Sequence, residues 1–243
     1  MRKANLNYAN GFYNWTMTYR LDSDIPNPYG FYVKSKRKVD VPSKEDLKKR
    51  KKLVAWFVSS CDVSSKRGKL VSKIMKYTKV DIYGKCGDLS CQKNDNECYQ
   101  LLENNYKFYL SFENSYCKDY VTEKLFNIYN ISVIPVVYGR ADYKKIAPPH
   151  SYINVEDFPS VEELVKYLKY LDENDDKYLE YFQWKSDYYV VSSFKYFICD
   201  LCKKLNTDFT PKTYKNIEKW WKGAEDDPSC YTNIDLPRIV IDD

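Results

Sequence analysis

The 243 residues, 44% of them hydrophobic, can build a sizeable core in one large or two modest domains, which excludes a chain that is disordered as a whole. The 39 basic and 34 acidic residues leave a net charge of only +5, too small for nucleic-acid binding to be the main task. No run approaches the roughly 20 apolar residues that span a bilayer, and the first ten residues are polar rather than a secretory core.

The cysteine content indicates an oxidising compartment. Eight cysteines are a high and even number, which favours such a compartment over the cytosol. Two N-glycosylation triplets, at Asn14 and Asn130, point the same way. We therefore expect a lumenal protein whose targeting segment belongs to a longer N-terminal portion that this sequence does not contain.

The first 50 residues are not expected to form a domain alone. A short alternating stretch covers residues 15–20, and a loop rich in Asp, Pro and Gly covers residues 22–30. The Lys-rich stretch at 42–52 is predicted to be a solvated helix face rather than a binding patch. We interpret this stretch as a linker between domains.

From residue 53 the chain alternates continuous apolar runs with amphipathic segments. Helices are predicted at 67–77, at 121–130 and from Ser160, where Ser160 and Glu163 form a capping-box pattern. Strands are predicted at 53–59, 80–83, 106–112, 133–138 and 151–155. Continuous rather than alternating apolar strands predict a parallel sheet with helices on both faces.

The predicted organisation therefore has three parts. Residues 51–205 form a Rossmann-like α/β lobe, residues 1–50 precede it, and a tail at 206–243 follows without clear periodicity. Trp220 and Trp221 in that tail are expected to pack against a partner surface rather than to take part in chemistry.

The carboxyl ends of the predicted strands indicate where a ligand would bind. In open parallel sheets the loops at that edge meet helix N-termini, whose free amides attract anions. Arg67 starts one helix, and a phosphate could lodge beside it. Lys124 lies in the first turn of another helix, for which Asp119 is a candidate cap, and opposes the helix dipole at a cost of about 0.3 to 1 kcal/mol. Lys124 is therefore either an exposed lysine or has a compensating anion, whereas Glu123 simply favours the dipole.

Motifs of several other classes are absent. Neither a Gly-x-Gly-x-x-Gly nor a Walker lysine loop occurs, which disfavours dinucleotide oxidoreductases and P-loop enzymes. Cys199 and Cys202 form a Cys-x-x-Cys pair, but this pair follows no suitable strand for a redox role. With the lone His150 the two cysteines do not reach four ligands at zinc spacing, so no metal site is predicted.

Several segments resemble the α-1,3-fucosyltransferase family. FENSYCKDYVTEK at 112–124 and VIPVVYG at 133–139 closely resemble its signature. NWTMTYR at 14–20, VDIYGKCG at 80–87 and SYIN at 151–154 are similar to it in the same order along the chain. The resemblance covers roughly residues 12–205, which makes a chance match untenable.

The resemblance implies a two-lobe GT-B glycosyltransferase. This chain would hold the C-terminal, GDP-fucose-binding lobe, with residues 1–50 as a remnant of the acceptor lobe and the inter-lobe linker. The implied reaction is inverting transfer of fucose from GDP-fucose to N-acetylglucosamine of glycans. The implied location is the lumenal side of the Golgi membrane, to which the protein would be attached by an anchor that this chain does not contain. The alternative is an inactive fragment that binds GDP or GDP-fucose without transfer.

No cofactor is implied by the resemblance, apart from GDP-fucose as the donor substrate. No Asp-x-Asp pair lies beside the expected diphosphate site, so stimulation by a divalent cation is left open. The implied partners are GDP-fucose and a glycan acceptor, with no nucleic acid, and the sequence does not name the acceptor glycan.

The resemblance also implies the roles of individual residues. Arg67 and Lys124 would pair with the diphosphate, whose charge grows in the transition state, and Glu123 would bind ribose hydroxyls. The implied donor-binding residues are Arg67, Asn114, Tyr120, Glu123 and Lys124, with Tyr109 and Glu113 as secondary candidates.

The remaining implications concern the acceptor lobe. Transfer needs a carboxylate base, which the family carries in the acceptor lobe, so no catalytic base is assigned in this chain. Asp22 and Asp24 are interpreted as turn formers. Cys199 and Cys202 are implied to bridge to cysteines of the acceptor lobe. Ser60 departs from the asparagine that relatives commonly carry there, which puts one donor contact in doubt.

Overall fold

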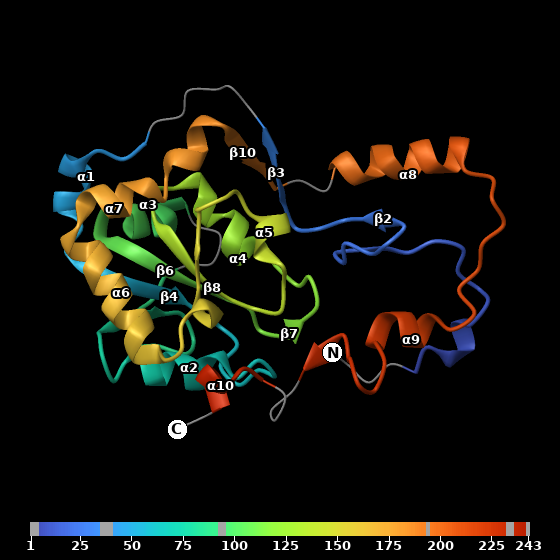
Figure 1. Ribbon diagram of the computed structural model, residues 1–243, viewed down its shortest axis with the longest axis horizontal. Coiled ribbons are helices and arrows are strands. Elements are labelled where there is room, and N and C mark those ends of the chain that lie inside the picture. Colours follow the sequence, from blue (N-terminus) through green and yellow to red (C-terminus); the bar gives the residue numbers. More distant parts are fainter. Residues whose placement is uncertain (1–4, 35–40, 92–95, 193–194, 232–235, 242–243) are drawn as a thin grey trace.

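The computed structural model describes residues 5–34, 41–91, 96–192, 195–231 and 236–241. The larger, left-hand part of the molecule in Figure 1 is built around a five-stranded parallel sheet in the order β5-β4-β6-β8-β9. The strands are β4 (Lys52–Phe57), β5 (Val80–Tyr83), β6 (Tyr106–Phe112), β8 (Ile134–Tyr138) and β9 (Ile153–Asn154). Every residue of β6 and β8 is buried, as the continuous apolar runs predict, because helices cover both faces of the sheet.

The pleat divides the core into two sides. Alternate residues such as Trp56, Leu110 and Val136 pack against α2 (Arg67–Ile74), α6 (Val161–Glu173) and α10 (Arg238–Ile241). Their neighbours along the strands, such as Ala55 and Val137, pack with residues from α3 (Asn96–Asn105), α4 (Glu123–Phe126) and α5 (Tyr143–Ile146). The predicted Rossmann-like parallel sheet is therefore confirmed.

Local capping differs from the sequence pattern at several helices. Ser160 caps α6 by accepting the Glu163 N–H at 3.2 Å, but the Glu163 carboxylate binds Lys166 instead of completing a capping box. The Lys-rich stretch contains α1 (Lys44–Lys49), which begins with a complete capping box between Ser43 and Asp46. The lysines of α1 are exposed, which agrees with the predicted solvated helix face, while Leu47 on its other face is part of the main core.

The helix predicted at 121–130 is shorter than expected. α4 ends at Phe126, and a 3-10 turn, η2 (Ile128–Asn130), follows it. Its N-cap is Thr122 rather than Asp119. Asp119 instead adopts a left-handed backbone conformation, with φ of 58°, and its carboxylate accepts the Leu21 N–H. α3, which precedes β6, was not predicted because its sequence is largely polar.

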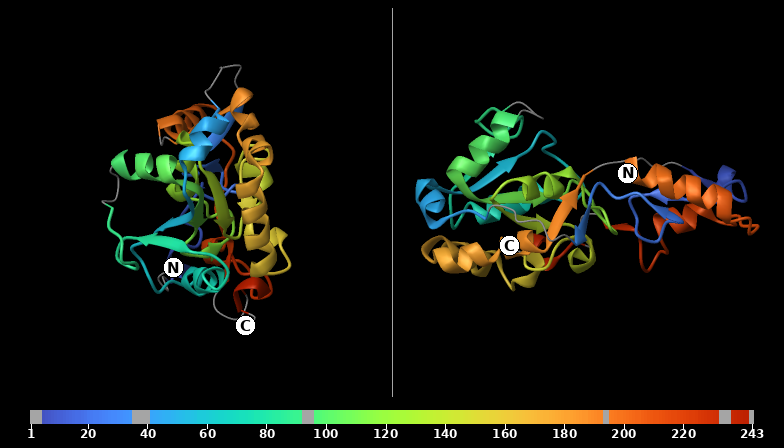
Figure 2. Two further views of the ribbon diagram at one scale, coloured as in Figure 1. Left: turned by 90° about the vertical axis from the view of Figure 1, so that its left-hand side faces the viewer. Right: turned by 90° about the horizontal axis from the view of Figure 1, so that it is seen from above.

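Residues 5–30 and residues 195–222 lie side by side, to one side of the sheet (Figure 2). The N-terminal part comprises η1 (Asn7–Ala9), β1 (Met17–Thr18) and β2 (Ile25–Pro26), and the later part comprises α8 (Lys195–Thr207) and α9 (Ile217–Lys222). α8 contacts β2, and α9 contacts η1. Backbone hydrogen bonds link Tyr214 to Gly11 and Tyr13. β3 (Phe31–Lys34) pairs antiparallel with β10 (Tyr188–Val191) where this part meets the sheet.

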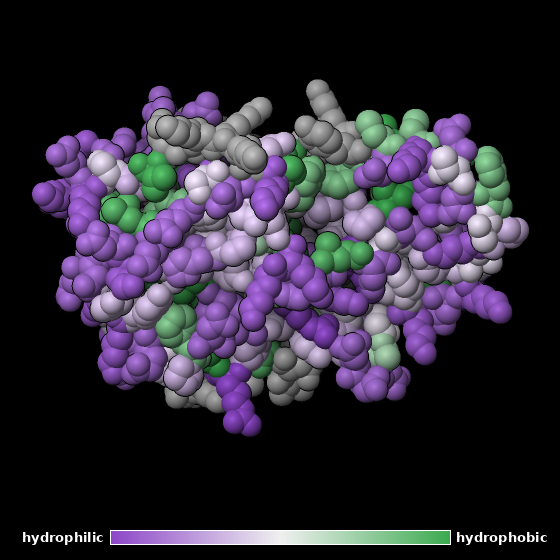
Figure 3. All heavy atoms as spheres, turned by 45° about the horizontal axis from the view of Figure 1, so that its top comes forward, coloured by the Kyte–Doolittle hydropathy of each residue, from purple (hydrophilic) through white to green (hydrophobic). Residues whose placement is uncertain are grey.

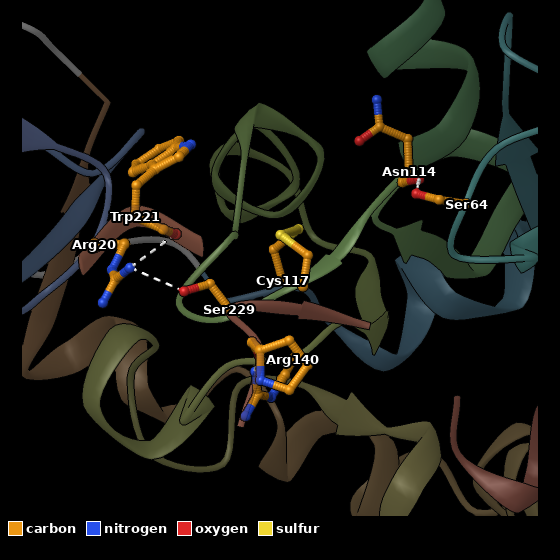
Figure 4. The surroundings of a disulfide bond; sticks show 9 residues. Arg20, Ser64, Asn114, Cys117, Arg140, Trp221 and Ser229 are labelled. Atoms are coloured by element: carbon orange, nitrogen blue, oxygen red, sulfur yellow. Dashed lines mark hydrogen bonds between the residues drawn. A yellow bond between two sulfur atoms is a disulfide. The ribbon is translucent and has the colours of Figure 1, made fainter. Parts of the chain in front are cut away.

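The chain then returns to the sheet. A disulfide joins Cys117 to Cys230, between the short strands β7 (Tyr116–Cys117) and β11 (Cys230–Tyr231) (Figure 4). Beyond it, Leu236 and Val240 are buried in the main core. The last residues that the structure describes are therefore part of the lobe's packing.

The tail tryptophans pack within the chain. The Arg20 guanidinium lies 4.5 Å from the Trp220 ring, and Trp221 contacts Tyr19 edge to face. The same Arg20 donates to the Trp221 carbonyl and the Ser229 hydroxyl (Figure 4). The surface that the two tryptophans cover is thus the N-terminal segment of their own chain.

Six cysteines form disulfides in the described residues. Besides Cys117–Cys230, the pairs are Cys61–Cys86 and Cys91–Cys98, whereas Cys199 and Cys202 on α8 are free and exposed.

The face seen in Figure 3 is mostly hydrophilic with scattered hydrophobic groups. Within the described ranges, no helix combines the length and the apolar character needed to cross a bilayer.

Candidate functional site

A cavity of about 300 Å³ opens at the carboxyl edge of β4, β5 and β6. Six of the seven candidate donor-binding residues line it. The lining candidates are Arg67, Tyr109, Asn114, Tyr120, Glu123 and Lys124. Parallel strands bring their following loops to one edge, so residues from three separate loops meet here.

Arg67 forms one wall of the cavity as the first residue of α2. The residue is only 3% exposed, and its terminal nitrogens donate to the carbonyls of Phe112 at 2.7 Å and Ser60 at 3.2 Å. Its Nε is buried and has no hydrogen-bond partner. Burial lowers the pKa of Arg67, and the nearby Glu113 carboxylate opposes that shift. Within the described ranges no carboxylate lies within ion-pair distance of the Arg67 guanidinium. This buried cation therefore has a free hydrogen-bond donor, Nε, that could bind an anion.

Lys124 lies on the wall formed by α4. Its Nζ is 2.6 Å from the Thr122 hydroxyl, 3.1 Å from a Glu113 carboxylate oxygen and 3.3 Å from a Glu123 oxygen. The chain's own carboxylates therefore compensate the charge that opposes the helix dipole. Because the Lys124 side chain remains 20% exposed, it can still meet a ligand in the cavity.

Asn114 and Tyr120 contribute uncharged polar groups. The Asn114 Oδ1 is buried without a partner, while its backbone carbonyl accepts the Ser65 N–H and the Ser64 hydroxyl (Figure 4). Burial raises the pKa of Tyr120, so its phenol is a neutral group at physiological pH. A buried polar atom without a partner is costly, and a ligand that supplies a donor to Asn114 would offset that cost.

Glu123 offers a different kind of group at the cavity. Its carboxylate is about half exposed, and although burial alone would raise its pKa, Lys124 and nearby hydrogen bonds lower it. Glu123 is thus an ionised acceptor at neutral pH, suited to hydroxyl donors.

Glu113 differs from the other candidates because it is not among the residues that line the cavity. Its carboxylate is 1% exposed and accepts hydrogen bonds from Thr122 and Lys124. Burial raises the pKa of Glu113, and the Lys124 ammonium opposes that shift.

Four further residues that line the cavity, three of them aromatic, were missed in the sequence. Phe57 and Tyr83, the last residues of β4 and β5, lie with their ring centroids 5.1 Å apart, and Tyr99 and Asn127 line the same cavity. Asn127 donates to the Tyr99 hydroxyl at 2.9 Å. The strand-end positions of Phe57 and Tyr83 were a signal that could have identified them, whereas Tyr99 belongs to the unpredicted α3.

The residues considered for other chemistry are engaged elsewhere. Asp22 pairs with Arg20 and Lys118, and Asp24 accepts from Thr16, Lys212 and Tyr214. The lone histidine, His150, stacks on Tyr181 with ring centroids 4.1 Å apart. No group of three or more potential metal ligands occurs in the part of the chain that the structure describes.

The fold and this cavity define the class of the protein as a Rossmann-type α/β lobe with a candidate ligand site at the carboxyl edge of its sheet, where two cations and several aromatic side chains line one cavity. Sequence comparison identifies the family. The model of the glycosyltransferase family 10 (fucosyltransferase) C-terminal region matches residues 47–220, and the fucosyltransferase N-terminal model matches residues 1–30. The chain therefore belongs to glycosyltransferase family 10, which confirms the resemblance seen in its motifs.

Individual relatives agree with this membership. The chain is 43% identical to alpha-(1,3)-fucosyltransferase C of Drosophila melanogaster, covering 90% of this chain and 56% of that protein. It is 41% identical to glycoprotein 3-alpha-L-fucosyltransferase A of the same organism, covering 86% and 43%. A crystal structure of an alpha1,3-fucosyltransferase with GDP-fucose is similar, with 25% identity and a TM-score of 0.53, over 69% of this chain and 50% of that one. The chain spans about half the length of the relatives it matches.

Proposed function

We propose that the cavity binds GDP-fucose and that, together with a facing acceptor lobe, this lobe serves the inverting transfer of fucose to N-acetylglucosamine of glycans. The observation that carries the proposal is the convergence of Arg67 and Lys124, from separate crossovers of the sheet, on one cavity. Two cations at a strand-end cavity match a diphosphate. Relatives named as fucosyltransferases and similar structures solved with GDP and GDP-fucose support the choice of nucleotide.

The diphosphate would lie between the two cations. The unpaired Nε of Arg67 and the Lys124 ammonium would donate to its oxygens, and both would stabilise the charge that grows as GDP departs. Fixed donors stabilise this charge better than mobile water does, because the donors are already oriented and need no rearrangement during the reaction. The two residues should therefore affect the rate of transfer as well as binding.

The other groups would bind the rest of the donor. The ionised Glu123 would accept hydrogen bonds from two ribose hydroxyls, and Asn114 and Tyr120 would contact the donor near the diphosphate. The neighbouring aromatic rings of Phe57 and Tyr83 would receive the planar base.

The proton of the acceptor hydroxyl must go to a carboxylate that we place in the acceptor lobe. Both candidate loop carboxylates, Asp22 and Asp24, are occupied by cations and hydrogen bonds in this chain. The three disulfides suit a lumenal site of action, and we propose the Golgi lumen.

Titration calorimetry with GDP tests the proposal. We expect the chain to bind GDP, and Lys124→Ala or Arg67→Ala to weaken binding by about tenfold to a hundredfold, the range for a lost charged hydrogen bond. Lys145→Ala is the matched control, because Lys145 is an exposed lysine on α5 away from the cavity, and it should leave GDP affinity unchanged. A change under about twofold in both site variants, or equal losses in the control, would remove the two cations from the site.

A further inference from the structure

A buried carboxylate lies in direct contact with one cation of the cavity, Lys124. Glu113 follows β6 directly, and one of its oxygens is 3.1 Å from the Lys124 Nζ. Of the charged groups around Arg67, the Glu113 carboxylate does most to oppose the effect of burial on the guanidinium. Glu113 thus contacts Lys124 directly and acts on Arg67 only at longer range.

Thr122 connects Glu113 to Lys124. Its backbone N–H donates to a Glu113 oxygen at 2.8 Å, and its hydroxyl lies within 3.0 Å of both Glu113 oxygens and 2.6 Å from the Lys124 Nζ. The hydroxyl can donate to the carboxylate while it accepts from the ammonium. Thr122 is also the N-cap of α4, yet its side chain makes no capping hydrogen bond. A residue type suited to capping is therefore used for this network instead.

The surroundings of Glu113 restrict its side chain to this position. A Cβ added at Gly139 would come within 3.4 Å of the Glu113 Cγ and within 2.8 Å of the Tyr143 hydroxyl. The carboxylate is also 1% exposed, so it has no route to solvent. Glu113 is fixed by packing, by Thr122 and by Lys124 together.

We propose that Glu113 is a positioning residue, which holds the Lys124 ammonium at the cavity wall through Thr122 and does not touch the donor. This inference rests on the proposed function, because it assigns Lys124 to the diphosphate. A lysine has a flexible four-carbon stem, and without a fixed partner its ammonium would sample many positions. Glu113 removes that freedom before the ligand arrives, which lowers the entropy cost of binding.

The three contacts of the ammonium divide into two kinds. Glu113 and Thr122 are buried, whereas the Glu123 carboxylate, 3.3 Å away, is about half exposed and lines the cavity. A phosphate oxygen can replace the Glu123 contact while the two buried contacts persist. Lys124 then bridges a fixed carboxylate and the ligand.

A double-mutant cycle measured by GDP calorimetry tests the inference. Glu113→Gln keeps the shape and removes the charge, and we expect it to weaken GDP binding by about tenfold in the native chain but by less than about twofold in a Lys124→Ala background. Thr122→Val, which removes only the hydroxyl, should behave in the same way. Glu162→Gln and Thr207→Val are the matched controls, since both residues are exposed and outside the cavity.

The outcomes separate the possible roles of Glu113. Equal losses with and without Lys124 would mean that Glu113 contacts the donor directly, and tighter binding by Glu113→Gln would mean that it only repels the diphosphate; either result overturns the positioning role. If Glu113→Gln fails to fold, as judged by circular dichroism, the Thr122→Val cycle decides by the same criterion. Absence of GDP binding by the native chain would instead refute the proposed function, and the inference with it.

Discussion

Removal of the disulfide between Cys117 and Cys230 should destabilise the lobe more than removal of either other disulfide. This bond closes a loop of 113 residues, against 25 for Cys61–Cys86 and 7 for Cys91–Cys98. A crosslink stabilises chiefly by restricting the unfolded chain, and the restriction grows with loop length.

The chain-entropy relation gives the expected magnitudes. At 25 °C the loops of 113, 25 and 7 residues correspond to about 4.8, 3.5 and 2.4 kcal/mol. A loss of 4.8 kcal/mol would lower the melting temperature by about 10 to 20 °C for a chain of this size. The residues beyond the 113-residue loop should also detach more readily, because Leu236 and Val240 then rely on packing alone.

Urea unfolding of three double Cys→Ser variants is the assay, with tyrosine and tryptophan fluorescence as the signal. Cys199 and Cys202 are replaced by serine in every protein, including the reference, because these exposed free thiols could exchange with the disulfides. We expect the free energy of unfolding to fall in the order of loop length. A smaller loss for Cys117–Cys230 than for Cys91–Cys98 would refute the reasoning.

Three further predictions concern charge and backbone conformation. Burial would raise the pKa of Asp24, but hydrogen bonds from its neighbours hold that pKa at about 2. The carboxylate therefore contributes about 2 kcal/mol to the free energy of unfolding above pH 4, and this contribution is lost as the pH falls through 2. In urea unfolding, Asp24→Asn should be less stable than the native chain by this amount at pH 7 and equally stable near pH 1.5. Burial lowers the pKa of Lys185 to about 8, so the folded chain binds fewer protons than the unfolded chain above that pH. The free energy of unfolding of the native chain should therefore rise by about 1 to 2 kcal/mol relative to Lys185→Met between pH 8 and 9.5. A difference between the two proteins that does not change with pH would contradict this prediction. Gly84, with φ of 98°, lines the cavity, and a Cβ at this position would lie 2.5 Å from the Val58 carbonyl oxygen. Gly84→Ala should therefore lower the free energy of unfolding by about 1 to 3 kcal/mol and weaken GDP binding. Gly68→Ala is the control and should do neither, because the nearest atom to a Cβ at Gly68 is 3.6 Å away.

The central sheet could be predicted from the sequence because its strands are continuous apolar runs. β5 and β6 begin and end where the sequence places them. α3 was missed, since only Cys98 and Leu102 of its ten residues are buried and its pattern is too polar to mark a helix. The helix predicted after Val121 is interrupted because Ile128 and Tyr129, although adjacent, are buried in different parts of the core, a requirement that local periodicity does not reveal.

The candidate site was predictable in its location and less so in its contacts. Strand ends indicate the edge of the sheet, which is why Arg67 and Lys124 line one cavity as expected. Their roles toward the donor stay a prediction. The pairing of Lys124 with Glu113 could not be foreseen, because the turn between them depends on Asp119 in a left-handed conformation, and residue type alone does not specify that backbone.

The position of a bound diphosphate tests the central claim most directly. A crystal structure of this chain with GDP should show phosphate oxygens within about 3 Å of both the Arg67 guanidinium and the Lys124 ammonium. A diphosphate that contacts neither residue, or that binds outside the cavity at the ends of β4, β5 and β6, would contradict the account.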